Sequence, residues 1–217
     1  MTRWASFDCY GTLIDWNAGI QAELSRVFGP REGEGEGEEE LLSRYHSLER
    51  ELERDGALSY RQVMAGVMAR LGAPPGEEGG LAESLPRWQP FPEVPAVLAE
   101  LRERGWRLAI LSNSDPDLIA ASKALLGVGF DETVVASEIG SYKPSLAHWE
   151  EFSARTGADP RRHVHVAASL YHDIAPALRL GLANIWINRL GELPGPTPML
   201  ELPDLESLPD ALEGLIS

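Results

Sequence analysis

A carboxylate stands directly after the first apolar segment of the chain. Residues 4–7 (Trp-Ala-Ser-Phe) are typical of a short strand, and Asp8 follows them, ahead of Gly11 and Thr12. Such a carboxylate can act as a nucleophile if a nearby cation keeps it ionised. It can equally cap a turn, and the Thr12 hydroxyl can either bind an anion or cap the next turn. Asp8 is therefore a candidate nucleophile with an ordinary structural alternative.

Further polar residues lie at or near the ends of later apolar segments. Ser112 and Asn113 follow a strand-like run and could bind an anion, although the same segment also resembles a helix start. Lys143 precedes a helix and has two possible roles. If its side chain points inward, the ammonium would keep Asp8 ionised; if it points outward, Lys143 is an ordinary surface lysine. Asp173 begins a helix and could cap it. Because the carboxyl ends of parallel strands meet at one edge of a sheet, this coincidence indicates a ligand site.

Strand-like and helical segments alternate through the second half of the chain. The expected strands are 4–7, 107–111, 132–136, 163–167 and 184–188, and the expected helices are 94–104, 118–126, 146–156 and 174–180. This alternation predicts an α/β fold, a Rossmann-like doubly wound parallel sheet with helices on both faces.

Residues 15–89 interrupt this alternation with helical spacing alone, at 17–28, 39–52 and 59–71. We therefore expect a core domain of residues 1–14 and 90–217 and an inserted α-helical cap of residues 15–89. In the cap, Arg44 lies opposite the apolar stripe of its helix, where it is either solvated or turned towards the site. Residues 32–38 alternate Glu and Gly and are expected to form a solvated loop.

The composition narrows the class of protein. The chain has 34 acidic and 19 basic residues and a net charge of −15, which argues against binding to nucleic acid or to an anionic membrane surface. No apolar stretch approaches the roughly 20 residues of a membrane span, and the N-terminus lacks a signal-peptide pattern. The single cysteine, Cys9, forms no internal disulfide, so we expect a cytoplasmic protein.

The motifs occur in a characteristic order along the chain: Phe7-Asp8-Cys9-Tyr10-Gly11-Thr12, Leu111-Ser112-Asn113, Tyr142-Lys143-Pro144, Asp173 after a strand, and Trp186-Ile187-Asn188-Arg189. This order resembles the haloacid dehalogenase superfamily, and within it the type II (L-2-haloacid) dehalogenases. The resemblance covers essentially the whole chain, including the helical insertion.

The resemblance implies a reaction and its catalytic residues. Asp8 would attack the halogen-bearing carbon of a small 2-haloacid and form an aspartyl ester, which water would then hydrolyse. Lys143 would pair with Asp8, and Asp173 would orient Lys143 or the hydrolytic water. No cofactor or metal is implied, the substrate is a small anion, and the resemblance allows a homodimer.

The resemblance also implies a set of substrate-binding residues. Thr12 and Ser112 would bind the substrate carboxylate or the nucleophile, while Arg44 and Asn113 would receive the departing halide. Tyr10 decides between branches, because phosphatases of this superfamily carry a second Asp there, which protonates the leaving oxygen. A halide leaves without a proton, so Tyr10 favours cleavage of a carbon–halogen bond.

Some residues depart from the pattern of the resembled family. Trp149 stands where that family usually has tyrosine, Ala168 where it has serine, Leu170 where it has asparagine, and His172 where it has an apolar aromatic. In the resembled family, the serine and the asparagine at these positions support the attack of water on the ester. In this chain, a small shift of Ser169 could supply the hydroxyl that Ala168 lacks. Two alternatives therefore remain open: a magnesium-dependent phosphatase, and a catalytically degenerate member that binds a metabolite or protein.

Overall fold

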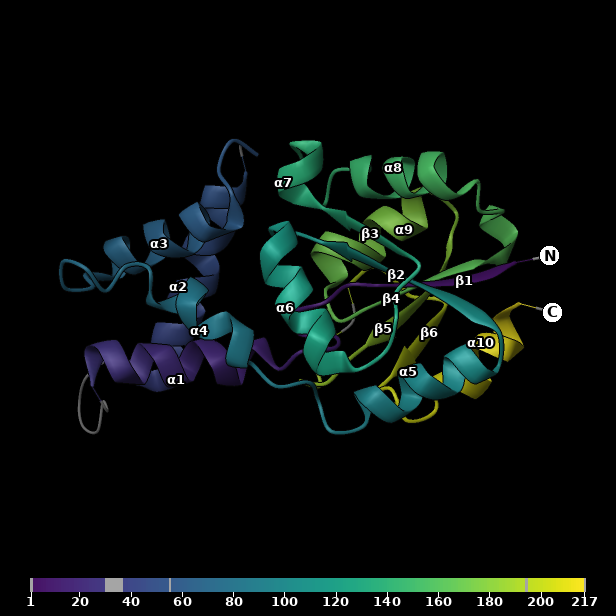
Figure 1. The fold of residues 1–217 in the computed structure, drawn as a ribbon, viewed down its shortest axis with the longest axis horizontal. Coiled ribbons are helices and arrows are strands. Elements are labelled where there is room, and N and C mark those ends of the chain that lie inside the picture. The colour runs from purple at the N-terminus through teal and green to yellow at the C-terminus, as the bar shows by residue number, and fades with distance from the viewer. Residues whose placement is uncertain (1, 30–36, 55, 194, 217) are drawn as a thin grey trace.

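A six-stranded sheet forms the centre of the computed structural model, which describes residues 2–29, 37–54, 56–193 and 195–216 (Figure 1). Its strands are β1 (Arg3–Phe7), β2 (Trp106–Ser112), β3 (Glu132–Val135), β4 (His163–Ala167), β5 (Ala183–Ile187) and β6 (Leu200–Leu202). They lie in the order β3-β2-β1-β4-β5-β6, and every neighbouring pair is parallel. This order is that of doubly wound nucleotide-binding folds, so the predicted Rossmann-like class is confirmed.

Helices cover both faces of the sheet: α5 (Val94–Glu103), α6 (Pro116–Leu126), α7 (Ala136–Ile139), α8 (Ala147–Thr156), α9 (Ala175–Arg179) and α10 (Leu208–Leu215). Side chains alternate along each central strand. Phe7 packs with the core beneath α5 and α10, whereas Trp4 packs with the core beneath α8. A strand buried on both faces needs apolar residues on both, which explains the near-continuous apolar runs in the sequence.

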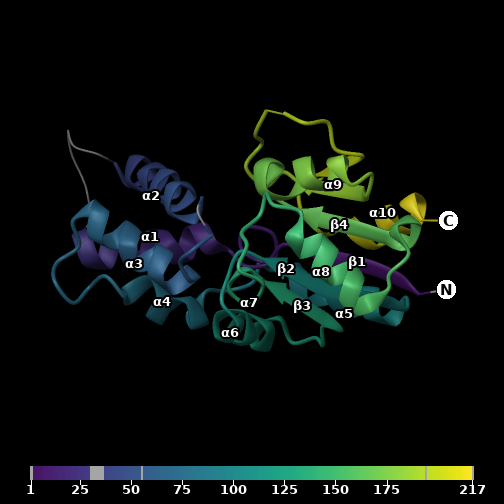
Figure 2. The same ribbon diagram turned by 90° about the horizontal axis from the view of Figure 1, so that it is seen from above.

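The remaining helices lie beyond the carboxyl ends of the strands, as both views of the ribbon show (Figures 1 and 2). They are α1 (Trp16–Phe28), α2 (Glu38–Glu53), α3 (Tyr60–Leu71) and α4 (Gly80–Ser84), followed by a 3₁₀ turn at Leu85–Arg87. The side chain of Asp15 accepts a hydrogen bond from Ala18 N and so caps α1. The chain leaves and re-enters the sheet region at adjacent points, because Ile14 and Pro90 form an antiparallel bridge.

The sequence expectations missed four short elements: α4, α7, the edge strand β6 and α10. Each is too short for its apolar pattern to be distinctive. The predicted helix at 174–180 is confirmed as α9, and a π-helical turn that the sequence did not predict, Leu170–Ile174, precedes it. Of the predicted loop 32–38, residues 32–36 lie outside the described residues, and Glu38 already belongs to α2.

Candidate active site

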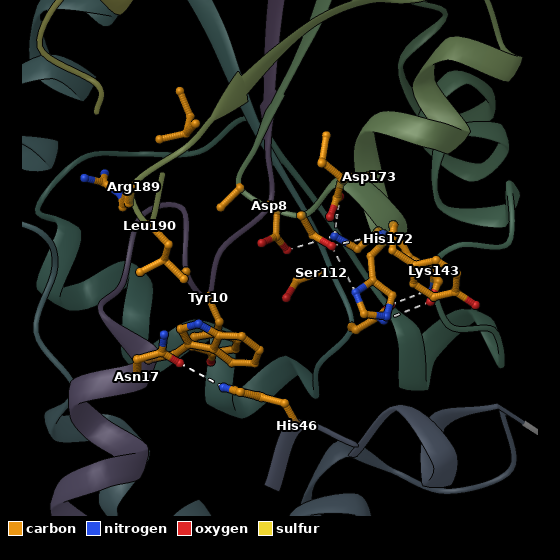
Figure 3. A pocket seen from close by; sticks show the side chains of 18 of the residues that line it. Asp8, Tyr10, Asn17, His46, Ser112, Lys143, His172, Asp173, Arg189 and Leu190 are labelled. Carbon is orange, nitrogen blue, oxygen red and sulfur yellow. Dashed lines mark hydrogen bonds and ion pairs between the residues drawn. The ribbon is translucent and has the colours of Figure 1, made fainter. Parts of the chain in front are cut away.

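Side chains from three neighbouring strand ends meet in one cavity of about 560 Å³ at the carboxyl edge of the sheet. Asp8 directly follows β1, Ser112 ends β2, and Asp173 lies in the turn after β4. Lys143 enters from the loop between α7 and α8, and Figure 3 shows all four near one another. The cavity therefore lies where β1 and β4 meet, the point at which the strand order reverses and ligands are expected.

Lys143 is the centre of this arrangement, and its side chain is only 1% exposed. Its ammonium donates to Asp8 Oδ1 at 2.8 Å, to Asp173 Oδ1 at 2.6 Å and to the Leu111 carbonyl at 2.8 Å. All three N–H groups thus have an acceptor. The predicted contact of Lys143 with both carboxylates is present, while the catalytic roles of the three residues stay predictions.

Charge and burial oppose each other in this cluster. Burial raises the pKa of Asp8, and the ammonium of Lys143 works against that rise. Burial would also raise the pKa of Asp173, but Lys143 and His165 outweigh it and hold that pKa well below its usual value. Burial alone would lower the pKa of Lys143, yet Asp173 and Asp8 raise it, so the ammonium stays charged. A charged lysine next to Asp8 favours the ionised form that nucleophilic attack requires.

Thr12 and Asn113 both contact this cluster, Thr12 through the expected nucleophile and Asn113 through the backbone of Lys143. Thr12 donates to Asp8 Oδ2 at 3.2 Å and accepts from Ala168 N at 2.9 Å, so it orients the carboxylate and does not line the cavity. Asn113 accepts from Lys143 N at 2.6 Å and donates to the Lys143 carbonyl at 3.1 Å. The amide of Asn113 thus fixes the loop that carries Lys143, and because Asn113 also lines the cavity, its contact with a halide stays a prediction.

Tyr10 lines the cavity with its ring, and Ser112 lines it as well. The Tyr10 ring stacks on Tyr60 with 6.1 Å between ring centroids, and its hydroxyl lies 3.2 Å from Ser122 Oγ. Burial raises the pKa of Tyr10 above its ordinary value. Such a phenol is a poor proton donor, so Tyr10 acts as a wall of the cavity and not as the acid that an alkoxide leaving group needs.

The opposite wall of the cavity comes from the helices before residue 89. His46, Glu49, Arg50 and Glu53 lie on one face of α2, three to four residues apart, and Asn17 of α1 hydrogen-bonds to His46 Nε2 at 2.9 Å. Glu49 accepts from the Tyr60 hydroxyl at 2.8 Å. Figure 3 shows Asn17 and His46 across the cavity from Asp8. Histidine and glutamate on this wall were not expected from the sequence.

Arg44 does not lie where the resemblance implied. Its side chain is exposed, and it is absent from the lining of the cavity. The reason is helical phase: Arg44 precedes His46 by two residues, about 200° around the helix, so the two cannot share a face. The expectation that Arg44 receives a departing halide is therefore wrong for this structure.

A hydrogen-bonded chain behind Asp173 was also missed. His165 Nε2 lies 3.0 Å from Asp173 Oδ1, while Ser6 Oγ lies 2.8 Å from His165 Nδ1 and 2.6 Å from His163 Nε2. Ser6 lies in β1, and both histidines lie in β4; all three side chains are buried. The only signal in the sequence is polar residues at alternate positions of buried strands, which the apolar pattern concealed.

The residues that depart from the resembled family fall into two places. Trp149 is buried in α8 against His165 and lies outside the cavity lining, so it is a core residue. Ala168, Leu170 and His172 all line the cavity next to Asp173. Ala168 offers only its backbone there, and its N–H is already bonded to Thr12.

The two carboxylates of the site are engaged by an ammonium. Among the described residues no group of three His, Cys, Asp or Glu side chains is placed to hold a metal. The two facing carboxylates of Asp8 and Asp173 are joined by the ammonium of Lys143. Magnesium is usually bound through one or two carboxylates with water completing its shell, so a metal-free reaction stays a prediction.

Comparison with known proteins gives the family. The model of the haloacid dehalogenase-like hydrolases matches residues 2–181. The chain belongs to this family. It is 30% identical to the (S)-2-haloacid dehalogenase of Pseudomonas sp. (strain YL), over 96% of this chain and 93% of the relative.

Two solved structures of dehalogenases have the same fold as this chain, and a phosphatase is also similar to it in sequence. The structure of an L-2-haloacid dehalogenase is similar with a TM-score of 0.83 and 25% identity, covering 98% of this chain and 99% of the other. That of the L-2-haloacid dehalogenase from Xanthobacter autotrophicus with chloropropionic acid covalently bound has a TM-score of 0.82 at 21% identity, covering 99% of each chain. The phosphoserine phosphatase of Thermus thermophilus is 29% identical over 78% of this chain and 72% of its own.

Proposed function

We propose that the protein hydrolyses the carbon–halogen bond of a small 2-haloacid through an ester on Asp8. The observation that carries this proposal is the pairing of Asp8 with a buried, charged Lys143, at a site where Tyr10 replaces a second carboxylic acid. A carboxylate nucleophile is available, whereas the acid that a poor leaving group needs is absent.

In the first half-reaction one carboxylate oxygen of Asp8 attacks the halogen-bearing carbon. A carbon–oxygen bond forms, the carbon–halogen bond breaks, and the halide leaves with the bonding electrons. Thr12 and Lys143 hold the two oxygens of Asp8 by hydrogen bonds and so fix the direction of attack. Ser112 lines the cavity and supplies a hydroxyl to the substrate carboxylate.

The cavity must also accept negative charge, because both the haloacid and the halide are anions. Arg50 and Arg189 line it and supply positive charge in place of Arg44. Burial raises the pKa of Glu53 well above its usual range, and the neighbouring Glu49 raises it further. A protonated Glu53 carries no charge, which removes a source of repulsion from the wall that faces the substrate.

We further propose that residues 15–89 act as a cap domain over a core of residues 1–14 and 90–217. The cavity has one wall from each part, and the chain passes between them only beside the Ile14–Pro90 bridge in the described residues. Bound substrate would then be screened from bulk water. Hydrogen exchange should slow in α1 and α2 when a non-reactive 2-alkanoate binds, and unchanged exchange there would argue against closure.

A panel of three substrates tests the proposed reaction. Chloroacetate, 2-chloropropionate and p-nitrophenyl phosphate are each incubated with the protein, with added magnesium and with EDTA. We expect halide release from the haloacids in both conditions and little or no release of phosphate. Phosphate release that EDTA abolishes would instead support a magnesium-dependent phosphatase, in line with the similarity to phosphoserine phosphatase. Inactivity on all three would favour a member that binds without turnover.

We infer two properties of the whole protein that stay predictions: a cytoplasmic location, from the composition, and assembly as a homodimer, from the family resemblance. Cys9 is free and buried, in keeping with a reducing compartment. No helix of the described residues is long and apolar enough to cross a membrane. Light scattering coupled to size-exclusion chromatography measures the oligomeric state directly, and a single peak at 23.8 kDa would exclude the homodimer.

A further inference from the structure

Hydrolysis of an ester on Asp8 needs a group that takes a proton from water, and the residues after β4 supply little for it. Ala168 has no polar side-chain atom, and Leu170 is apolar. The hydroxyl of Thr12 is occupied by Asp8 and by Ala168 N. Lys143 is a donor only, and all its N–H groups are used. Asp173, whose Oδ2 has no hydrogen-bond partner among the described residues, and His172 are then the candidate bases next to Asp8 in the cavity lining.

His172 lies in the same cavity lining as Asp8, in the turn that follows β4. Ser169 fixes its position twice: Ser169 Oγ accepts the backbone N–H of His172 at 3.0 Å and lies 3.2 Å from ring atom Nδ1. The other ring nitrogen, Nε2, is therefore directed away from the turn. Figure 3 shows His172 beside Lys143 and Asp173, on the same side of the cavity as Asp8.

The second ring nitrogen faces a carboxyl group from the other part of the molecule. His172 Nε2 lies 3.7 Å from Glu53 Oε2 at the end of α2, and the Glu53 side chain is 8% exposed. This distance is too long for a direct hydrogen bond, and it suits two groups that share one water molecule. Both side chains line the cavity that also holds Asp8.

We propose that His172, oriented by Ser169 and Glu53, removes a proton from the water that hydrolyses the ester on Asp8. This inference rests on the proposed dehalogenase function and extends it to the second half-reaction. The water oxygen bonds to Asp8 Cγ, and the bond between Cγ and the alkyl oxygen breaks. One proton of the water passes to the imidazole, and the other ends on the hydroxyl of the departing 2-hydroxyacid. The imidazolium then returns its proton to solvent.

The protonation states fit this role. Burial lowers the pKa of His172, Asp173 partly offsets this and Lys143 adds to it, so the ring is neutral and able to accept a proton at neutral pH. The other titratable or charged groups that face the ring are Glu49, Arg50 and Glu53, all on α2. Asp173 is the competing base, but its lowered pKa makes it a weak proton acceptor. In this scheme His172 is the catalytic residue, and Glu53 is a positioning residue.

The test separates the two half-reactions by mixing enzyme with excess 2-chloropropionate. In the His172→Gln variant we expect one halide per chain in an initial burst, at close to the wild-type rate. Steady turnover should then be about 10²-fold slower. Mass spectrometry of the intact protein should show the ester accumulated on Asp8. Glu53→Gln should show a smaller loss of kcat with the burst rate retained, and Glu53→Asp should recover part of it.

Arg161→Ala is the control, since this side chain is 89% exposed and does not line the cavity. It should neither slow turnover nor accumulate ester. If His172→Gln turns over without accumulating ester, or loses the burst along with turnover, His172 is not the base and Asp173 takes its place. If the wild-type protein releases no halide from any haloacid, the proposed function itself fails, and this inference fails with it.

Discussion

At the scale of single residues, the site depends on a match of donors and acceptors around one ammonium. Lys143 has three N–H groups, and the two carboxylates and the Leu111 carbonyl accept all of them. Buried charges are tolerated only when paired in this way, since an isolated charge in the interior costs several kcal/mol. The same pairing that stabilises the cluster also favours the ionised form of Asp8, against the effect of burial.

Replacement of Asp8 by Asn should abolish halide release, by at least about 10³-fold, because the neutral amide is a poor nucleophile. Halide release measures the loss, and circular dichroism should show the fold intact. Wild-type protein turned over once in ¹⁸O water should carry the label in Asp8, because water attacks its carboxyl carbon. Asp159→Asn, in a surface turn, is the control. Full activity of Asp8→Asn, with deamidation excluded by mass, would refute the mechanism.

Replacement of Lys143 by Met should remove activity and lower the free energy of unfolding at pH 7 by about 3–5 kcal/mol, because two buried carboxylates lose their cation. The difference in the free energy of unfolding between wild type and variant should shrink as the pH falls towards 4. A carboxylate that has bound a proton is uncharged and no longer needs a cation beside it. Urea unfolding at both pH values measures this. Lys123→Met, which loses only a bond to Thr133, should cost less than about 1 kcal/mol. Equal effects of the two substitutions would contradict a buried ion cluster.

At the scale of elements, the phase of α2 decides which side chains face the substrate. His46, Glu49, Arg50 and Glu53 line the cavity, whereas Arg44 is exposed on another side of the same helix. A sequence motif places a residue on a helix but not on a face of it, because each step along the chain turns the side chain by about 100°. The apolar stripe led by Leu41 and Tyr45 fixes that phase by burial.

Arg44→Ala should therefore change kcat/KM for 2-chloropropionate by less than about threefold, a difference below about 0.7 kcal/mol. Arg50→Ala, one of the residues that line the cavity, should raise KM more, because it removes positive charge next to an anionic substrate. Steady-state kinetics of the two variants side by side decide the matter. A loss of 10²-fold in Arg44→Ala would show that the helix turns this residue inward during the reaction.

At the scale of the whole molecule, the cavity joins two parts of the chain whose buried charges meet. Glu53 comes from the helices, whereas Asp8, Lys143 and Asp173 come from the sheet. Burial raises the pKa of Glu53, and Glu49 adds to the rise, while Lys143 opposes it. The packing of the helices on the sheet is therefore linked to protonation of this group.

The linkage gives a stability prediction with a definite sign. A pKa that is raised in the folded state adds stability below the unfolded pKa, near 4.3, and this stability is lost as the pH rises through the folded value. The glutamine in Glu53→Gln does not titrate, so the variant does not lose this stability as the pH rises. The Tm of the variant minus the Tm of the wild type should therefore increase from pH 5 to pH 8. Thermal unfolding of both proteins at the two pH values measures it. A difference that does not change with pH would mean that Glu53 does not titrate in this way.

The sequence alone determined the parallel α/β class, the helical insertion and the order of the motifs, because apolar periodicity and residue spacing are local properties. It also pointed to Asp8, Lys143 and Asp173, since the ends of parallel strands must converge. Only the tertiary structure decided that Arg44 faces away, that Asn113 holds the Lys143 loop, and that Glu53 faces His172. Those outcomes depend on helical phase and on contacts between residues far apart in the chain, and no local pattern encodes them.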